Sequence, residues 1–123
     1  MISLLTAKGL VKSFGALRAS DGIDLEVGEG ETHAVIGPNG AGKTTFISQL
    51  AGSVRPDAGW IAFAGEDITR LSTASRARRG LARSFQITSV YLDFTALQNV
   101  ALAVLARSGR TASATFCSAV KSR

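Results

Sequence analysis

The sequence has one cysteine, Cys117, which excludes an internal disulfide and any cluster of cysteine ligands for a metal. It has no long apolar run either. The longest uncharged one, Val100 to Ala106, has seven residues, whereas crossing a bilayer takes roughly 20. Residues 1–10 lack the basic-then-apolar layout of a secretion signal. We therefore expect no membrane span and no export signal, and the single cysteine fits a reducing compartment.

Acidic residues are scarce in the second part of the chain. Residues 1–69 carry eight acidic and five basic side chains, whereas residues 70–123 carry nine basic side chains and one acid, Asp93. Clustered arginines are typical of phosphate binding, but these are not interleaved with the aromatic residues on which single-stranded nucleic acids stack. We therefore expect no nucleic-acid partner and interpret the cluster as a solvated helix face or a face for an acidic protein. Its members are Arg70, Arg76, Arg78, Arg79 and Arg83.

With 123 residues, 46% of them hydrophobic and 19% charged, the chain is long and apolar enough for one globular domain. Residues 23–27 alternate apolar and acidic side chains, which predicts a half-buried strand. The apolar residues 32–36 predict a strand covered on both faces in a parallel sheet, and His33 is interpreted as a strand-end residue without a catalytic role. Further strands are predicted at 60–63 and 81–85, and helices from Lys43 to a stop at Gly52, over 72–79, and after the cap Thr95.

Periodicity fades from Ser108 onward, where Gly, Ser, Thr and Ala dominate, and the sequence contains no internal repeat. We therefore divide the chain into one domain over residues 1–107 and a low-periodicity tail over residues 108–123. Strands that alternate with helices predict an α/β fold.

A glycine-rich loop between a predicted strand and a predicted helix carries the strongest functional signal. Its nine residues satisfy the pattern G-x-x-x-x-G-K-[ST]: Gly37, Pro38, Asn39, Gly40, Ala41, Gly42, Lys43, Thr44 and Thr45. Glycines let successive backbone amides surround a phosphate, and the helix start adds the positive end of its dipole. Lys43 supplies a full charge for the β- and γ-phosphates, and the Thr44 hydroxyl can ligate Mg²⁺. The loop therefore predicts a nucleoside triphosphate as ligand.

These residues resemble the first half of the nucleotide-binding domain of ABC transporters. The resemblance rests on GPNGAGKTT, on the strand pair around GIDLEVGEGETHAVI, and on RPDAG and ARSFQ after the loop; it runs from about Leu4 to Arg107. The stretch RRGLARSFQITSVYLDFTALQNV is similar to the ATP-binding subunits of branched-chain amino acid importers. The resemblance implies a partial P-loop NTPase fold of the ABC ATPase type, with an N-terminal antiparallel β part.

The resemblance also implies roles for residues outside the loop. Phe14 stands where the family's aromatic residue stacks on adenine, although composition alone would make it a core residue. Gln86 falls at the glutamine that contacts Mg²⁺ and the attacking water, so Lys43 and Gln86 would be the catalytic residues present. Residues 87–93 would form part of the surface that receives a short cytoplasmic helix of the permease. The implied cofactors are ATP and Mg²⁺. The implied partners are a second ATP-binding subunit and a permease, on the cytoplasmic side of the inner membrane.

Several motifs of the complete family unit are missing after Gln86. No LSGGQ-type signature, no apolar strand ending in a Walker B aspartate, no adjacent catalytic glutamate and no switch histidine follow it. Asp93 follows no run of four apolar residues, and His33 precedes the phosphate loop. We therefore expect an ATP hydrolase by family whose 123 residues are inactive alone. We also expect a truncated product that is marginally folded.

Two other functions stay open at this point. One is a non-catalytic nucleotide-binding remnant, which would bind ATP without hydrolysing it. The other is a different soluble P-loop NTPase or kinase, which would carry guanine-selecting or substrate-phosphate residues that the sequence does not display.

Overall fold

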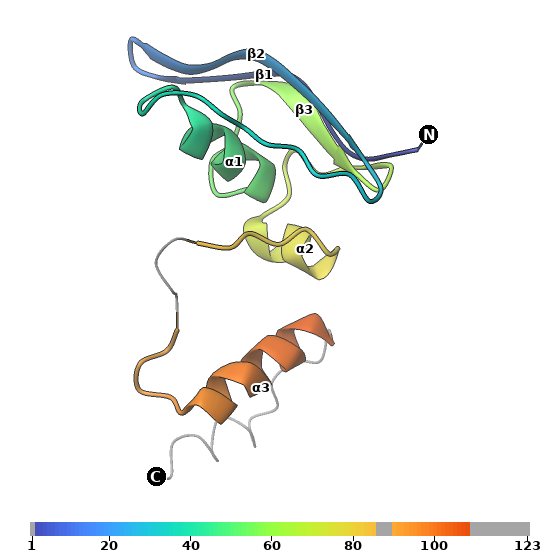
Figure 1. The fold of residues 1–123 in the computed structure, drawn as a ribbon, viewed down its shortest axis with the longest axis vertical. Coiled ribbons are helices and arrows are strands. Elements are labelled where there is room, and N and C mark those ends of the chain that lie inside the picture. Colours follow the sequence, from blue (N-terminus) through green and yellow to red (C-terminus); the bar gives the residue numbers. More distant parts are fainter. Residues whose placement is uncertain (1, 86–89, 109–123) are drawn as a thin grey trace. The chain divides into compact units, whose positions relative to one another are not determined.

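The computed structural model describes residues 2–85 and 90–108, and the chain divides into two units, Met1–Ala82 and Arg83–Arg123. The first unit is built on a four-stranded sheet in the order β2-β1-β3-β4, in which all neighbouring strands are antiparallel (Figure 1). The predicted antiparallel β part is thereby confirmed. The strands are β1 (Ser3–Phe14), β2 (Leu17–Gly28), β3 (Ala58–Phe63) and β4 (Glu66–Asp67).

Strands β1 and β2 form a long hairpin whose register runs from the pair Ser3 and Gly28 to the pair Phe14 and Leu17. The predicted alternation over residues 23–27 is confirmed, since the apolar side chains there are half-buried and the acidic ones exposed. Strand β1 itself was not predicted from periodicity. Its register shifts between Ala7 and Leu10, where Gly9 has a φ of 59°, so its apolar residues do not keep a period of two.

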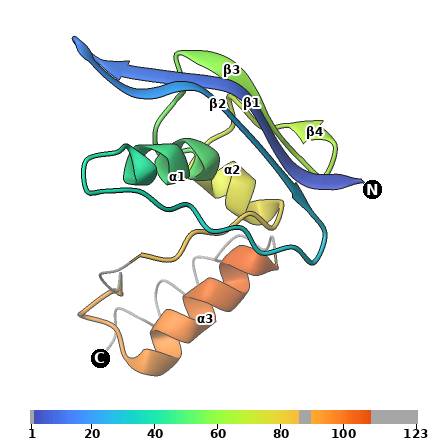
Figure 2. The same ribbon diagram turned by 45° about the horizontal axis from the view of Figure 1, so that its top comes forward.

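Helices α1 (Lys43–Ala51) and α2 (Thr73–Arg78) lie on one side of the sheet (Figures 1 and 2). The start of α1 at Lys43 and its end before Gly52 agree with the prediction, and Gly52 adopts the left-handed conformation typical of a helix C-terminus. The Ser72 hydroxyl caps α2 by accepting a hydrogen bond from the Ser75 amide at 3.2 Å. The buried core consists of Ala7, Leu10, Phe46, Leu50, Ile61 and Ile68.

Two predicted strands are wrong. Residues 32–36 and 81–85 are neither helix nor strand, and Val35 and Ile36 are 42% and 89% exposed. A strand of a parallel sheet needs a neighbour on each side, because a lone extended segment leaves its amides and carbonyls unpaired. In the part of the chain that the structure describes, no strand pairs with either segment. Apolar composition alone therefore did not decide their conformation.

The close approach of β3 to β1 requires a glycine at position 59. Gly59 has a φ of +88°, and a Cβ there would lie 2.4 Å from the Gly9 carbonyl oxygen and 2.5 Å from that of Lys8. We expect Gly59→Ala to lower the free energy of unfolding by roughly 3 kcal/mol, measured by urea denaturation, because strain and backbone displacement add. Gly65→Ala is the matched control.

Gly65 has a φ of +81° and no atom within 4 Å of the added methyl group, so its alanine variant carries only conformational strain, about 1 kcal/mol. Equal losses of stability in the two variants would contradict the proposed steric contact between β3 and β1.

The second unit contains helix α3 (Ala96–Arg107), as predicted. A capping box starts it: the Thr95 hydroxyl accepts from the Gln98 amide, and the Gln98 side chain accepts from the Thr95 amide. Leu97, Val100 and Val104 are more than half exposed, and no described residue of α3 is buried. None of the described helices is long and apolar enough to cross a bilayer. Of the predicted tail, Ser108 is the C-cap of α3, and residues 109–123 lie outside the described residues.

Candidate functional site

A hollow of about 320 Å³ joins the glycine loop to the far end of the β1–β2 hairpin. It brings together two segments that are 20 residues apart in the sequence. The hairpin contributes Phe14, Leu17, Arg18 and Ala19 to its lining. The loop and the first turn of α1 contribute Asn39, Gly40, Ala41, Gly42, Lys43, Thr44 and Thr45. Gly37 and Pro38 belong to the predicted loop and do not line the hollow.

The N-terminus of α1 is open toward this hollow. Its first helical hydrogen bond runs from the Phe46 amide to the Gly42 carbonyl, at 2.9 Å. The amides of Lys43, Thr44 and Thr45 therefore have no acceptor within the helix. The N-cap, Gly42, offers no side-chain cap, and the first turn has no acidic residue. Free amides and the positive end of the helix dipole make this a site for an anion.

Position 42 requires glycine both for its backbone conformation and for steric reasons. Its φ is +92°, and a Cβ there would lie 2.2 Å from the Ala19 carbonyl oxygen of β2. The start of α1 thus rests directly on the backbone of β2. This contact fixes the distance between the loop and the hairpin, which are the two walls of the hollow.

The Lys43 ammonium group folds back over the loop. Its Nζ donates to the Gly37 carbonyl, and to the Pro38 carbonyl at 2.9 Å. The Pro38 carbonyl also accepts from the Ala41 amide at 3.2 Å, which closes the loop into a turn. A full positive charge therefore lies on the same loop that presents the free amides. Thr44 is exposed at the lining, where its hydroxyl is available as an oxygen ligand.

Phe14 is the last residue of β1 and is 50% exposed, so it is not the core residue that composition would suggest. Its ring borders the hollow, and the Lys12 ammonium lies 5.4 Å from the ring centroid. Gln86 lies outside the described residues, as do residues 87–89 of the predicted permease surface. Among the residues that are described, no group of three or more His, Cys, Asp or Glu side chains could hold a metal ion.

Sequence reasoning missed the role of Arg76. The interpretation of the arginine cluster as a solvated face is wrong for this residue, which is 1% exposed. Its Nη1 donates to the carbonyls of Gln49 and Leu50 in the last turn of α1, at 2.8 and 2.7 Å. Arg79, by contrast, forms an exposed ion pair with Glu66 at 2.9 Å. No local signal separates Arg76 from its neighbours, because only the fold brings α1 to it.

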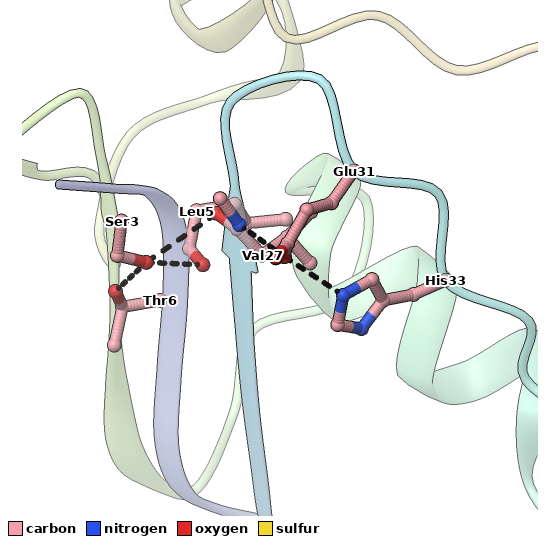
Figure 3. A network of polar contacts seen from close by, with 7 residues as sticks. Ser3, Leu5, Thr6, Val27, Glu31 and His33 are labelled. Carbon is pink, nitrogen blue, oxygen red and sulfur yellow. Dashed lines mark hydrogen bonds and ion pairs between the residues drawn. The ribbon is translucent and has the colours of Figure 1, made fainter. Parts of the chain in front are cut away.

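Glu31 and His33 belong to a separate polar network (Figure 3), and neither residue lines the hollow. The Nε2 of His33 lies 3.0 Å from Oε2 of Glu31, which is two residues earlier in the chain. The same carboxylate accepts the Gly28 amide at 2.7 Å. That backbone hydrogen bond, followed by the one to His33, lowers the pKa of Glu31 below its ordinary value. The network stabilises the turn after β2. His33 lies in a segment that is neither helix nor strand, so its interpretation as a strand-end residue is wrong.

The family model described as "ABC transporter" matches residues 20–122. The branched-chain amino acid transport ATP-binding protein BraF of Pseudomonas aeruginosa is 40% identical over 81% of this chain and 39% of its own length. The probable branched-chain amino acid transport ATP-binding protein LivG of Methanocaldococcus jannaschii is 34% identical over 80% of this chain and 38% of its own. Other relatives are named for import of ribose and of sulfate or thiosulfate, lipoprotein release and daunorubicin resistance.

Solved structures agree with these matches. A nucleotide-free ATP-binding cassette from an ABC transporter is 29% identical, with a TM-score of 0.76 over 99% of this chain and 49% of its own. The chain thus spans about two fifths of the length of the branched-chain amino acid relatives. Its fold is a partial P-loop NTPase fold of the ABC ATPase type, as the sequence predicted. With a family match over most of its length, the chain belongs to the ABC transporter family.

Proposed function

We propose that this chain forms the nucleotide-binding part of the ATP-binding subunit of an ABC importer, with branched-chain amino acids as the transported class. The observation that carries the proposal is the hollow itself, in which an uncapped, acid-free helix start and an exposed aromatic ring face the same space. The names of BraF and LivG support the substrate class. We also propose that residues 1–107 are the N-terminal part of the ATP-binding domain and that residues 108–123 are a low-periodicity tail.

In this proposal the nine residues Gly37 to Thr45 form the phosphate-binding loop. Seven of them line the hollow, and Gly37 and Pro38 contribute through the carbonyls that accept from Lys43. The hairpin wall of the hollow binds the base. The free amides of the α1 start bind phosphate oxygens, and Lys43 Nζ exchanges its carbonyl partners for the β- and γ-phosphates. Phe14 stacks on the adenine ring. Because Mg²⁺ prefers hard oxygen ligands, the Thr44 hydroxyl and the Gln86 amide oxygen would hold it, and it would neutralise charge on the bound phosphates.

We also propose partners for this chain and an absence of ATP turnover by the 123 residues alone. A second ATP-binding subunit and a permease would complete the transporter, with this subunit peripheral on the cytoplasmic face of the inner membrane. Gln86 would orient the attacking water. The 123 residues contain no signature, Walker B aspartate, catalytic glutamate or switch histidine after Gln86. Since hydrolysis in this class depends on positioning and charge stabilisation, we propose that the 123 residues bind ATP without turning it over.

A titration of the 123-residue chain with a fluorescent ATP analogue in Mg²⁺ buffer tests this function. We expect saturable binding that ATP displaces at least as well as GTP, and phosphate release at the background rate. Preferential displacement by GTP would favour a different soluble P-loop NTPase. Phosphate release above background would contradict the proposed lack of turnover, and no saturable binding would contradict the function as a whole.

A further inference from the structure

Phe14, the base-stacking residue of the proposed site, lies at the end of β1, where the strand pairs with only one neighbour. The last pair between β1 and β3 joins Val11 to Ala58, so residues 12–14 pair with β2 alone. The register between β1 and β2 also shifts between Lys12 and Ser13. Phe14, half-exposed, is therefore fixed neither by core packing nor by a neighbouring strand on its second side.

Asp57 supplies the missing support at this point. Its Oδ2 accepts the Ser13 amide at 2.8 Å, and its Oδ1 accepts from Lys12 Nζ at 2.9 Å. Its own amide donates to the Val11 carbonyl at 2.8 Å. The backbone and the side chain of Asp57 together therefore pair with β1 immediately before β3 begins at Ala58. The two hydrogen bonds lower the pKa of Asp57, the Ser13 amide contributing more than Lys12. The carboxylate is thus charged at neutral pH and holds the Lys12 ammonium in place.

The Lys12 ammonium in turn lies over the Phe14 ring, 5.4 Å from its centroid. The Lys12 side chain is 17% exposed, whereas that of Lys8 on the same strand is 42% exposed. A cation over one face of an aromatic ring is attracted by the ring quadrupole and favours one ring orientation. The same ring is half-exposed and lines the hollow, where a planar base would contact it.

We propose that Lys12 and Asp57 are positioning residues that hold the Phe14 ring in the orientation in which it stacks on the adenine base. The inference rests on the proposed function, because it requires a bound nucleotide. Neither residue lines the hollow, so both act through Phe14 and not on the ligand. It follows that their loss affects the affinity for the base and leaves the affinity for the phosphates unchanged.

The experiment compares two ligands on the 123-residue chain: ATP, and inorganic tripolyphosphate, which has the phosphates without the base. We expect Lys12→Met and Asp57→Asn each to weaken ATP binding by about threefold to tenfold and to leave tripolyphosphate binding unchanged. Lys8→Met is the matched control. Lys8 is also on β1 and also pairs with an aspartate, Asp24, at 3.7 Å, and its variant should bind both ligands as the wild type does.

A double variant tests whether Lys12 acts through the ring. If it does, Lys12→Met adds no further loss of ATP affinity to Phe14→Ala, because the group that it orients is already absent. Additive losses would overturn the inference. So would wild-type ATP affinity in Lys12→Met, or a parallel loss of tripolyphosphate affinity, which a general loosening of the fold would cause. A wild-type chain that binds neither ligand would instead overturn the proposed function, and with it this inference.

Discussion

Replacing Lys43 with alanine is expected to abolish tight ATP binding, with an affinity at least about 100-fold below that of the wild type. Lys43 is the one full positive charge among the loop residues that line the hollow, and its Nζ lies on the loop carbonyls next to the free amides. The backbone amides remain in the variant, but partial charges alone do not balance a triphosphate. Titration of wild type and variant with the same fluorescent ATP analogue measures the difference.

The control for this variant separates a local contact from net charge. Lys8→Ala removes the same formal charge from a lysine on β1 that lies outside the hollow. We expect it to change ATP affinity by less than about twofold at physiological ionic strength, since Lys8 does not line the hollow and salt weakens the effect of a solvent-exposed charge. Equal affinities for wild type and Lys43→Ala would show that the glycine loop does not hold the nucleotide.

The parts of the site that the sequence predicts well are those with local causes. Helix α1 starts and ends where the loop motif and Gly52 indicate, because a helix terminus depends on the few residues around it. The alternation over residues 23–27 likewise depends only on which face of β2 is exposed. From these local signals the loop side of the hollow could be predicted, although Gly37 and Pro38 of the predicted loop do not line it.

The parts that sequence reasoning missed depend on distant partners. Residues 32–36 carry the composition of a buried parallel strand, yet such a strand forms only beside others, and in the described residues none pairs with it. Strand β1 was obscured by its bulge near Gly9. Arg76 was grouped with exposed arginines, because burial of one guanidinium among several depends on which carbonyls the fold brings to it. The opposite wall of the hollow could be placed only by family resemblance at Phe14.

Replacing Arg76 with alanine is expected to cause the largest loss of stability, about 3 kcal/mol or more in the free energy of unfolding. Four carbonyl groups accept hydrogen bonds from this one buried side chain: those of Gln49, Leu50, Thr69 and Leu71. Two of them end α1, where a positive charge is favoured by the helix dipole. Alanine leaves all four without this donor and opens a cavity in their place. The expected loss is a large share of the stability of a small domain, which is about 5–15 kcal/mol.

The fold leaves space for this guanidinium on the side of α1 as well. A Cβ at Gly52 would lie 2.8 Å from Arg76 Nε, so the glycine that ends the helix also admits the arginine. Burial lowers the pKa of Arg76 and the nearby Asp67 raises it, yet a guanidinium stays protonated in either case. The carbonyls therefore contact a permanent charge, and stability derived from this contact should not vary with pH between 5 and 9.

Urea denaturation of three variants tests the role of Arg76. Arg78→Ala is the matched control, because Arg78 lies on the same helix and is exposed, and its loss should change the free energy of unfolding by less than about 0.5 kcal/mol. Arg76→Lys keeps the charge but cannot reach four carbonyls at once, so its stability should fall between those of the wild type and Arg76→Ala. If Arg76→Ala is too unstable to measure, the lysine variant carries the test. A loss no larger than that of Arg78→Ala would mean that α1 and α2 are held together by the apolar core alone.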